Sequence, residues 1–231
     1  LAAENPEKLA ELQQLFLVEA AKYNVFPLDD RKVERLNPEI AGRPDLMAGR
    51  TRLTVYEGMV GMAENVFLNV KNRSHTITAE VEIPEGGAEG VLLAHGSWFA
   101  GYSFYVKDRR LHYAHNYLGL AEYRIDATED LPAGRHTLRF RFARTGEHRG
   151  RGQLFVGDRL VGEGEIPHTV PHVMETSGEG LCCGYDSGLP VTPDYRAPFR
   201  FTGRIDEVVG DVDDAPPPDA EAQLRTALTD H

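Results

Sequence analysis

The segment from Gly101 to Tyr117 constrains the fold of this chain more than any other part of the sequence. Side chains in its two arms, Gly101–Lys107 and Leu111–Tyr117, alternate in character with a period of two. A short polar turn at Lys107–Arg110 joins the arms. This pattern is typical of a β-hairpin with one half-buried face. A hairpin alone is at best marginally stable in water, so the rest of the chain must supply further strands.

Similar short runs with a period of two recur on both sides of the hairpin. They cover residues 52–56, 66–70, 75–83, 91–96, 122–125, 136–143, 153–156, 160–166, 180–184 and 199–209. The 23 glycines and 14 prolines fit many short strands joined by turns. The sequence therefore predicts a mainly β fold, a two-sheet antiparallel sandwich of jelly-roll type, with a closed barrel as the alternative.

The ends of the chain differ from this β region. Asn5 and Pro6 mark the start of a helix whose apolar stripe runs to about Lys22. Its apolar side needs a partner surface, either the sandwich or a body upstream. We expect three parts: residues 1–50 as a terminal helix with a wrapping connector, residues 51–212 as the sandwich, and residues 213–231 as an acidic, proline-rich tail. A short helix over 219–229 is predicted in that tail.

Composition excludes some functions. A formal charge of −11, from 25 basic and 36 acidic residues, disfavours binding to a nucleic-acid backbone. No apolar run approaches the roughly 20 residues of a membrane-spanning helix.

The start of the chain lacks Met, so we expect a piece of a longer protein. Cys182 and Cys183 are adjacent and are predicted to be buried free thiols. They do not indicate an oxidising compartment; the location stays open, with the cytoplasm favoured.

The run from Glu80 to Glu85 places carboxylates at the spacing of some retaining glycosidases, with Glu80 and Glu82 on one face of a strand. One of the two would act as the nucleophile, with the other assisting. Pro84 ends the strand early, however, and an exposed charged strand face that limits aggregation is the simpler interpretation.

Two other groups are candidates for ligand binding. Trp98, Tyr102 and Tyr105 are candidates for a carbohydrate-recognition surface, and the alternative function that they suggest is a carbohydrate-binding module that holds a sulfated glycan. Asp186 and Asp194 lie in a loop between strands and are candidates for binding a cation or contacting a neighbouring domain. The alternative for this loop is a purely structural role. The histidines show no metal-ligand spacing, so no metal site is expected.

Several motifs together resemble the C-terminal part of large bacterial arylsulfatases. The resemblance begins in the helix, continues through its exit at 20–31 and extends to about Val212. The matching pieces of the β region are Gly101–Val106, Leu131–Thr137, Gly184–Val191 and Pro198–Ile205. In that family they belong to a concanavalin A-like β-sandwich that follows the catalytic region.

The resemblance implies a parent enzyme that hydrolyses sulfate esters. Such enzymes use a formylglycine made from Cys or Ser in the motif Cys/Ser-x-Pro-x-Arg, beside a divalent cation such as calcium. This chain lacks the motif: Cys182 is followed by Cys183 and Gly184, and Pro190 stands one place late after Ser187. We therefore expect no catalytic residue and no cofactor in this chain. The expected role is an accessory sandwich that packs on the missing upstream sulfatase domain, shapes substrate access, and is inactive alone.

Overall fold

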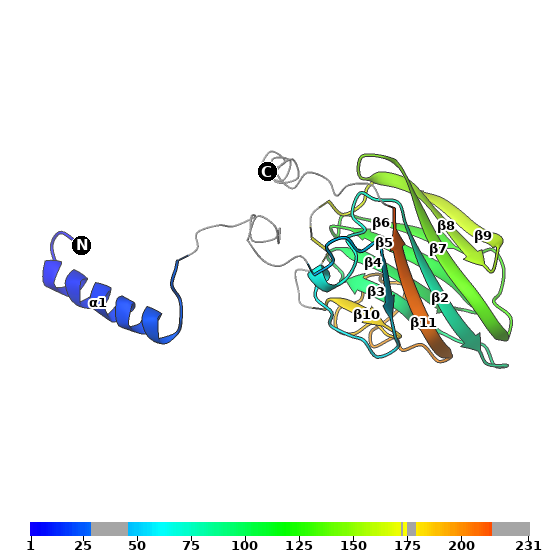
Figure 1. Ribbon diagram of the computed structural model, residues 1–231, viewed down its shortest axis with the longest axis horizontal. Coiled ribbons are helices and arrows are strands. Elements are labelled where there is room, and N and C mark those ends of the chain that lie inside the picture. Colours follow the sequence, from blue (N-terminus) through cyan, green and yellow to red (C-terminus); the bar gives the residue numbers. More distant parts are fainter. Residues whose placement is uncertain (29–45, 172, 175–178, 214–231) are drawn as a thin grey trace.

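Two antiparallel β-sheets pack face to face and form the body of the molecule (Figure 1). The structure is a computed structural model that describes residues 1–28, 46–171, 173–174 and 179–213. The six-stranded sheet has the order β1 (Arg52–Val55), β11 (Arg204–Val212), β2 (His75–Ile83), β7 (Gly134–Gly146), β8 (Arg149–Val156) and β9 (Arg159–Ile166). The five-stranded sheet has the order β10 (Leu181–Cys183), β3 (Gly90–Gly96), β4 (Gly101–Lys107), β5 (Arg110–Tyr117) and β6 (Ala121–Asp126). The predicted two-sheet antiparallel sandwich is confirmed.

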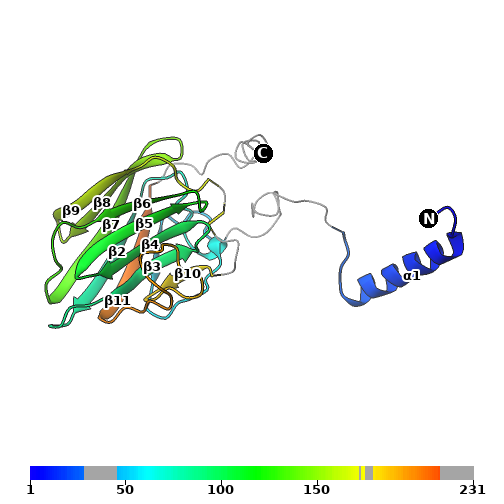
Figure 2. The same cartoon turned by 180° about the vertical axis from the view of Figure 1, so that it is seen from behind.

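Figure 2 shows the two sheets from behind, one layer against the other. The core lies between them, where the inward side chains of β4 and β5 meet those of β7. Tyr113 stacks on Phe140 across the interface, with ring centroids 3.5 Å apart. Leu138 and Leu154 are also fully buried. The period-two pattern on β7 and β8 thus supplies one wall of the core, and the hairpin supplies the other.

The predicted hairpin consists of β4 and β5, in register from Gly101 with Asn116 to Lys107 with Arg110. Its turn residues Asp108 and Arg109 both have positive φ, 48° and 63°, as in the tight turns that match the twist of a hairpin. The expectation of one half-buried face is wrong, because both faces are buried. The segment after β10 covers the outer face, where Val191 and Tyr195 pack on Tyr105.

The N-terminal helix α1 spans Pro6–Lys22, as predicted from the sequence. Pro6 occupies the first turn, while the Asn5 side chain donates to the carbonyl of Leu1 and does not cap the helix. Large apolar side chains of α1 are solvent-exposed, among them Leu12 and Phe16. No helix in the described ranges has the length and apolar character needed to cross a bilayer.

Other parts of the prediction differ or fall outside the described residues. The strand predicted at 66–70 is wrong: η2, a short 3₁₀ helix, spans Glu64–Val66, and extended chain follows. Cys182 and Cys183 are buried and free, as expected. Most of the connector after Arg31 and the whole of the tail helix over 219–229 lie outside the described residues. The domain boundaries therefore stay predictions.

Candidate functional site

The predicted aromatic ligand surface is divided between two faces of the five-stranded sheet. Tyr102 points into the core and is fully buried, whereas Tyr105 points to the opposite face of β4. Trp98 lies in the connection between β3 and β4, and 56% of its surface is exposed. The three side chains therefore do not form one continuous platform.

The structure does bring Tyr105 and Asp194 together, although 89 residues separate them. The Tyr105 hydroxyl donates to Asp194 at 2.8 Å, and Lys107 and Arg124 each approach the same carboxylate at 3.0 Å. Burial would raise the pKa of Asp194, but the hydrogen bonds from Lys107 and Tyr105 and the charge of Arg124 outweigh it and hold the pKa below its usual value. Asp194 therefore links the covering loop to β4 and β6.

Asp186 is the second anchor of this loop, and only 1% of its surface is exposed. It accepts hydrogen bonds from the hydroxyl of Tyr195 at 2.6 Å and from the backbone N–H of Val191 at 3.3 Å. Burial raises the pKa of Asp186 to about 6, against the lowering effect of these hydrogen bonds. Both predicted aspartates thus have protein partners. In the described part of the chain, no group of three or more His, Cys, Asp or Glu side chains is placed to hold a metal ion.

A polar groove of about 440 Å³ lies next to Asp194, at the turn end of the hairpin. Its lining residues are Asp108, Arg110, His112, Arg124, Asp126 and Asp130. Asp126 contacts His112 Nδ1 at 2.6 Å and Arg124 at 2.8 Å. The other ring nitrogen of His112 lies 3.0 Å from the carbonyl of Lys107, and the ring stacks on Tyr105. The groove therefore has ordered walls that offer both carboxylate acceptors and guanidinium donors.

Trp98 is presented to solvent by a rigid local arrangement. The Asn116 side-chain amide donates to the Trp98 carbonyl at 2.7 Å and to the Val191 carbonyl at 2.8 Å. Asn116 Oδ1 accepts from the backbone N–H of Gly119 at 2.9 Å. Leu120, 79% exposed, follows in the same turn. The buried side-chain amide of Asn116 thus connects the three loops that contain Trp98, Gly119 and Val191.

Glu80 and Glu82 lie on the outer face of the six-stranded sheet. Both carboxylate oxygens of Glu80 are 2.9 Å from the hydroxyl of Thr137, and Glu82 pairs with Arg204 at 2.8 Å. Arg135 lies 3.8 Å from the same Glu82 oxygen. These contacts make a charged sheet surface, and they do not place either carboxylate in the groove described above.

The sequence prediction missed His112, Arg124, Asn116 and Tyr195. The sequence held a partial signal for Asn116. This polar residue follows the small residue Ala114 on the outer face of β5, close to the end of the strand. The others take their roles from long-range pairing: Arg124 reaches Asp194 only because β6 pairs with β5 and the loop after β10 folds over both. No local pattern contains that information.

Comparison with known proteins yields similarity to solved structures alone. No protein-family model matches the chain, and no curated protein sequence matches it. The CBM40 of the Ruminococcus gnavus IT-sialidase, solved bound to α2,3-sialyllactose, shares 13% identity with a TM-score of 0.47, covering 77% of this chain and 96% of that chain. A heptameric SAP-like pentraxin from Limulus polyphemus shares 12% identity with a TM-score of 0.37, covering 71% of this chain and 75% of that chain. These likenesses concern the β-sandwich fold alone.

Proposed function

We propose that this chain is a non-catalytic β-sandwich module of an arylsulfatase-type protein, which packs against a catalytic body through α1. The observation that carries the proposal is the exposed apolar side of this helix. The sequence motifs that resemble the C-terminal part of bacterial arylsulfatases indicate that this partner is a sulfatase catalytic domain.

The side chains of Leu9, Leu12 and Phe16 follow one another at helical spacing and are 40%, 50% and 48% exposed. A helix of 17 residues gains most of its stability in a protein from packing such a side against a partner. Covering each of these half-exposed side chains is worth about 1 kcal/mol. A partner surface for α1 would therefore stabilise both the helix and the complex.

Several observations support a non-catalytic role. The sequence lacks the formylglycine motif, and Glu80 and Glu82 engage Thr137 and Arg204 on the outer face of a sheet. Asp186 and Asp194 serve as anchors of a loop. Sulfate-ester hydrolysis would then belong to the upstream body, together with its formylglycine and its divalent cation.

Binding between this chain and the polypeptide encoded upstream of Leu1 tests the proposal. That polypeptide is expected to contain Cys/Ser-x-Pro-x-Arg, to bind this chain in titration calorimetry, and to hydrolyse nitrophenyl sulfate. This chain alone is expected not to hydrolyse it. The double variant Leu12→Asp and Phe16→Asp is expected to lose binding. The control variant Gln13→Asp and Gln14→Asp, on the same helix, is expected to keep it. An upstream sequence without the motif, or binding that survives the Leu12 and Phe16 changes, contradicts the proposal.

A second candidate function is carbohydrate binding, favoured by the exposure of Trp98 in the connection between β3 and β4. Aromatic side chains are common in small-molecule binding sites, where a few polar groups fix the orientation of the ligand. Glycan-array binding that is lost in Trp98→Ala, but kept in Tyr56→Ala at another half-exposed aromatic, would support it. Equal binding by both variants would exclude Trp98 as the contact.

A further inference from the structure

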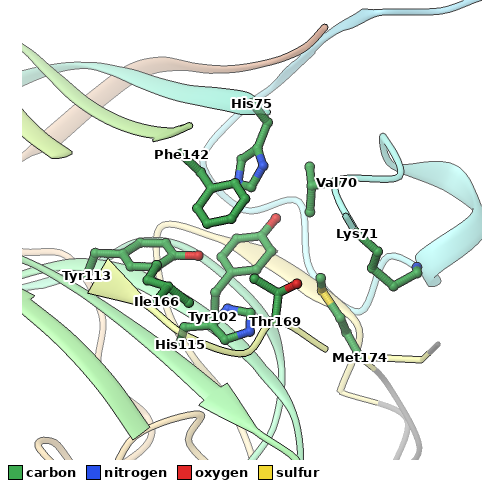
Figure 3. Close-up of a pocket in the computed structure, with 10 residues that line it drawn as sticks. All are labelled: Val70, Lys71, His75, Tyr102, Tyr113, His115, Phe142, Ile166, Thr169 and Met174. Atoms are coloured by element: carbon green, nitrogen blue, oxygen red, sulfur yellow. The ribbon is translucent and has the colours of Figure 1, made fainter. Parts of the chain in front are cut away.

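A small cavity lies between the two sheets at the end where the loops after η2 and β9 meet (Figure 3). Its volume of about 10 Å³ matches the space that one water molecule needs. The lining residues are Val70, Lys71, His75, Tyr102, Tyr113, His115, Phe142, Ile166, Thr169 and Met174. The cavity is separate from the polar groove and from Trp98, since it shares no residue with either.

Three polar atoms that line this cavity have no hydrogen-bond partner among the described residues. They are the Tyr102 hydroxyl, His75 Nε2 and the Thr169 hydroxyl. Each of these residues is more than nine-tenths buried, with exposures of 0%, 7% and 7%. In Figure 3 the hydroxyl end of Tyr102 points toward the ring of His75, and Thr169 lies beside Tyr102. Buried polar atoms in native proteins are almost always paired, with protein groups or with ordered water.

The protonation states of these groups fix which of them donate. His75 Nδ1 lies 3.0 Å from the carbonyl of Arg73, which only accepts, so Nδ1 carries the hydrogen. Burial lowers the pKa of His75 to about 4, so the ring is neutral at pH 7 and Nε2 is an acceptor. The hydroxyls of Tyr102 and Thr169 each donate or accept.

We propose that this cavity is a buried hydration site in which one water molecule joins Tyr102, His75 and Thr169. The water donates one hydrogen to His75 Nε2 and the other to one of the two hydroxyls, and it accepts from the remaining hydroxyl. All three protein atoms are then satisfied, and the water has the three hydrogen bonds typical of an internal water. Because His75 begins β2 and Tyr102 belongs to β4, the water connects the two sheets.

The lining favours water over an ion. The imidazoles of His75 and His115 are neutral at pH 7 because burial lowers their pKa values, and the hydroxyls are neutral as well. The one ammonium at the cavity, from Lys71, is paired with Glu64. Glu64 also accepts a hydrogen bond from the backbone N–H of Met174 at 3.0 Å. This ion pair therefore holds Met174 over the cavity and leaves no unbalanced charge there for an ion to neutralise.

A crystal structure that resolves ordered water tests the proposal. One density peak is expected within about 2.7–3.2 Å of all three atoms in the wild type. It is expected to be absent from the double variant Tyr102→Phe and Thr169→Val. A dry cavity in the wild type, or direct hydrogen bonds among the three side chains, would overturn the proposal.

Urea unfolding of the same variants gives an independent readout. If one water joins the two hydroxyls, the first substitution removes it, and the second then shifts the midpoint less than it does alone. Thr137→Val, which removes a hydroxyl on the outer face of β7, is the matched control and is expected to add fully to Thr169→Val. Additive shifts for the Tyr102 and Thr169 pair would contradict a shared water.

Discussion

At the scale of single residues, Tyr195 fixes the loop that covers the five-stranded sheet. Its hydroxyl donates to the buried carboxylate of Asp186 at 2.6 Å and lies 2.8 Å from the hydroxyl of Ser103 on β4. Its ring also stacks on Phe199, with centroids 4.8 Å apart. One side chain thus connects both ends of the loop to the strand beneath it.

We expect Tyr195→Phe to lower the free energy of unfolding by about 1–3 kcal/mol, because Asp186 loses a donor while it remains buried. The pKa of Asp186 in the folded protein is already raised to about 6, so its stabilising contribution is complete below its usual pKa of 3.8 and is lost as the pH rises through 6. Loss of the Tyr195 donor raises this pKa further. The destabilisation should therefore be larger at about pH 8 than at about pH 5 in urea unfolding.

Tyr185→Phe is the control for this measurement, because the Tyr185 ring packs under Arg200, whereas the hydroxyl that donates to the Asp186 carboxylate belongs to Tyr195. It is expected to change stability little at either pH. Equal losses for Tyr195→Phe at both pH values would show that the carboxylate is not the group affected.

At the scale of elements, the start of β3 is fixed by close backbone contact with the segment before β11. Val91 forms a parallel bridge with Arg200, and the backbone N–H of Thr202 donates to the carbonyl of Glu89 at 2.8 Å. Gly90, with a φ of +123°, lies where an added Cβ would be 2.2 Å from the carbonyl oxygen of Arg200. The position thus requires glycine both for its backbone angle and for its lack of a side chain.

Gly90→Ala and Gly134→Ala separate these two requirements. Gly134 has a similar φ of +114°, but an added Cβ there would meet nothing within 4 Å. Gly134→Ala should lower the free energy of unfolding by about 1–3 kcal/mol from backbone strain alone. Gly90→Ala should cost at least about 2 kcal/mol more, since β3 or the 199–202 segment must move. Urea unfolding measures both, and equal losses would mean that the contact with Arg200 is readily relieved.

At the scale of the whole molecule, the described part of the sandwich encloses three histidines whose burial keeps them neutral at pH 7. Burial lowers the pKa of His75 and of His95 to about 4, and that of His115 to about 3. In the unfolded chain each histidine has its ordinary pKa near 6.5 and binds a proton more readily than in the fold. The contribution of these buried, neutral imidazoles to the free energy of unfolding is therefore complete above about pH 6.5, and it decreases progressively as the pH falls toward 4.

The free energy of unfolding is accordingly expected to fall between about pH 6.5 and pH 4, by about 1.4 kcal/mol per pH unit for each histidine that differs fully in protonation. The raised pKa of Asp186 opposes this trend over part of the same range. Urea unfolding as a function of pH measures the net slope. A flat profile from pH 7 to about pH 4.5 would contradict the burial of neutral imidazoles.

The sequence predicts much of this fold because alternation within a strand is a local property. The run from His75 to Ile83 was predicted with the bounds that β2 has, and its buried and less buried residues alternate strictly. The strand predicted at 66–70 failed because Phe67, Leu68 and Val70 are all buried without forming a ladder. An apolar run indicates burial, but it does not specify a strand.

The candidate site was less predictable, for a different physical reason. Trp98 could be placed in a loop, and its exposure follows from that place. The burial of Tyr105 depends on a loop that starts some eighty residues later, and its bond to Asp194 exists only after the outer face is covered. Side chains on the outer face of a sheet have no local signal that distinguishes solvent from a covering loop.

The pairing of β1 with β11 has a consequence for how such a sandwich is built into a longer polypeptide. Arg52, at the beginning of β1, lies opposite Asp211, near the end of β11, and their side chains form an ion pair at 3.1 Å. The points where the chain enters and leaves the sandwich therefore lie side by side. If the sandwich were inserted into a surface turn of a host protein, the two ends of that turn would stay close together, and the host fold would need little rearrangement.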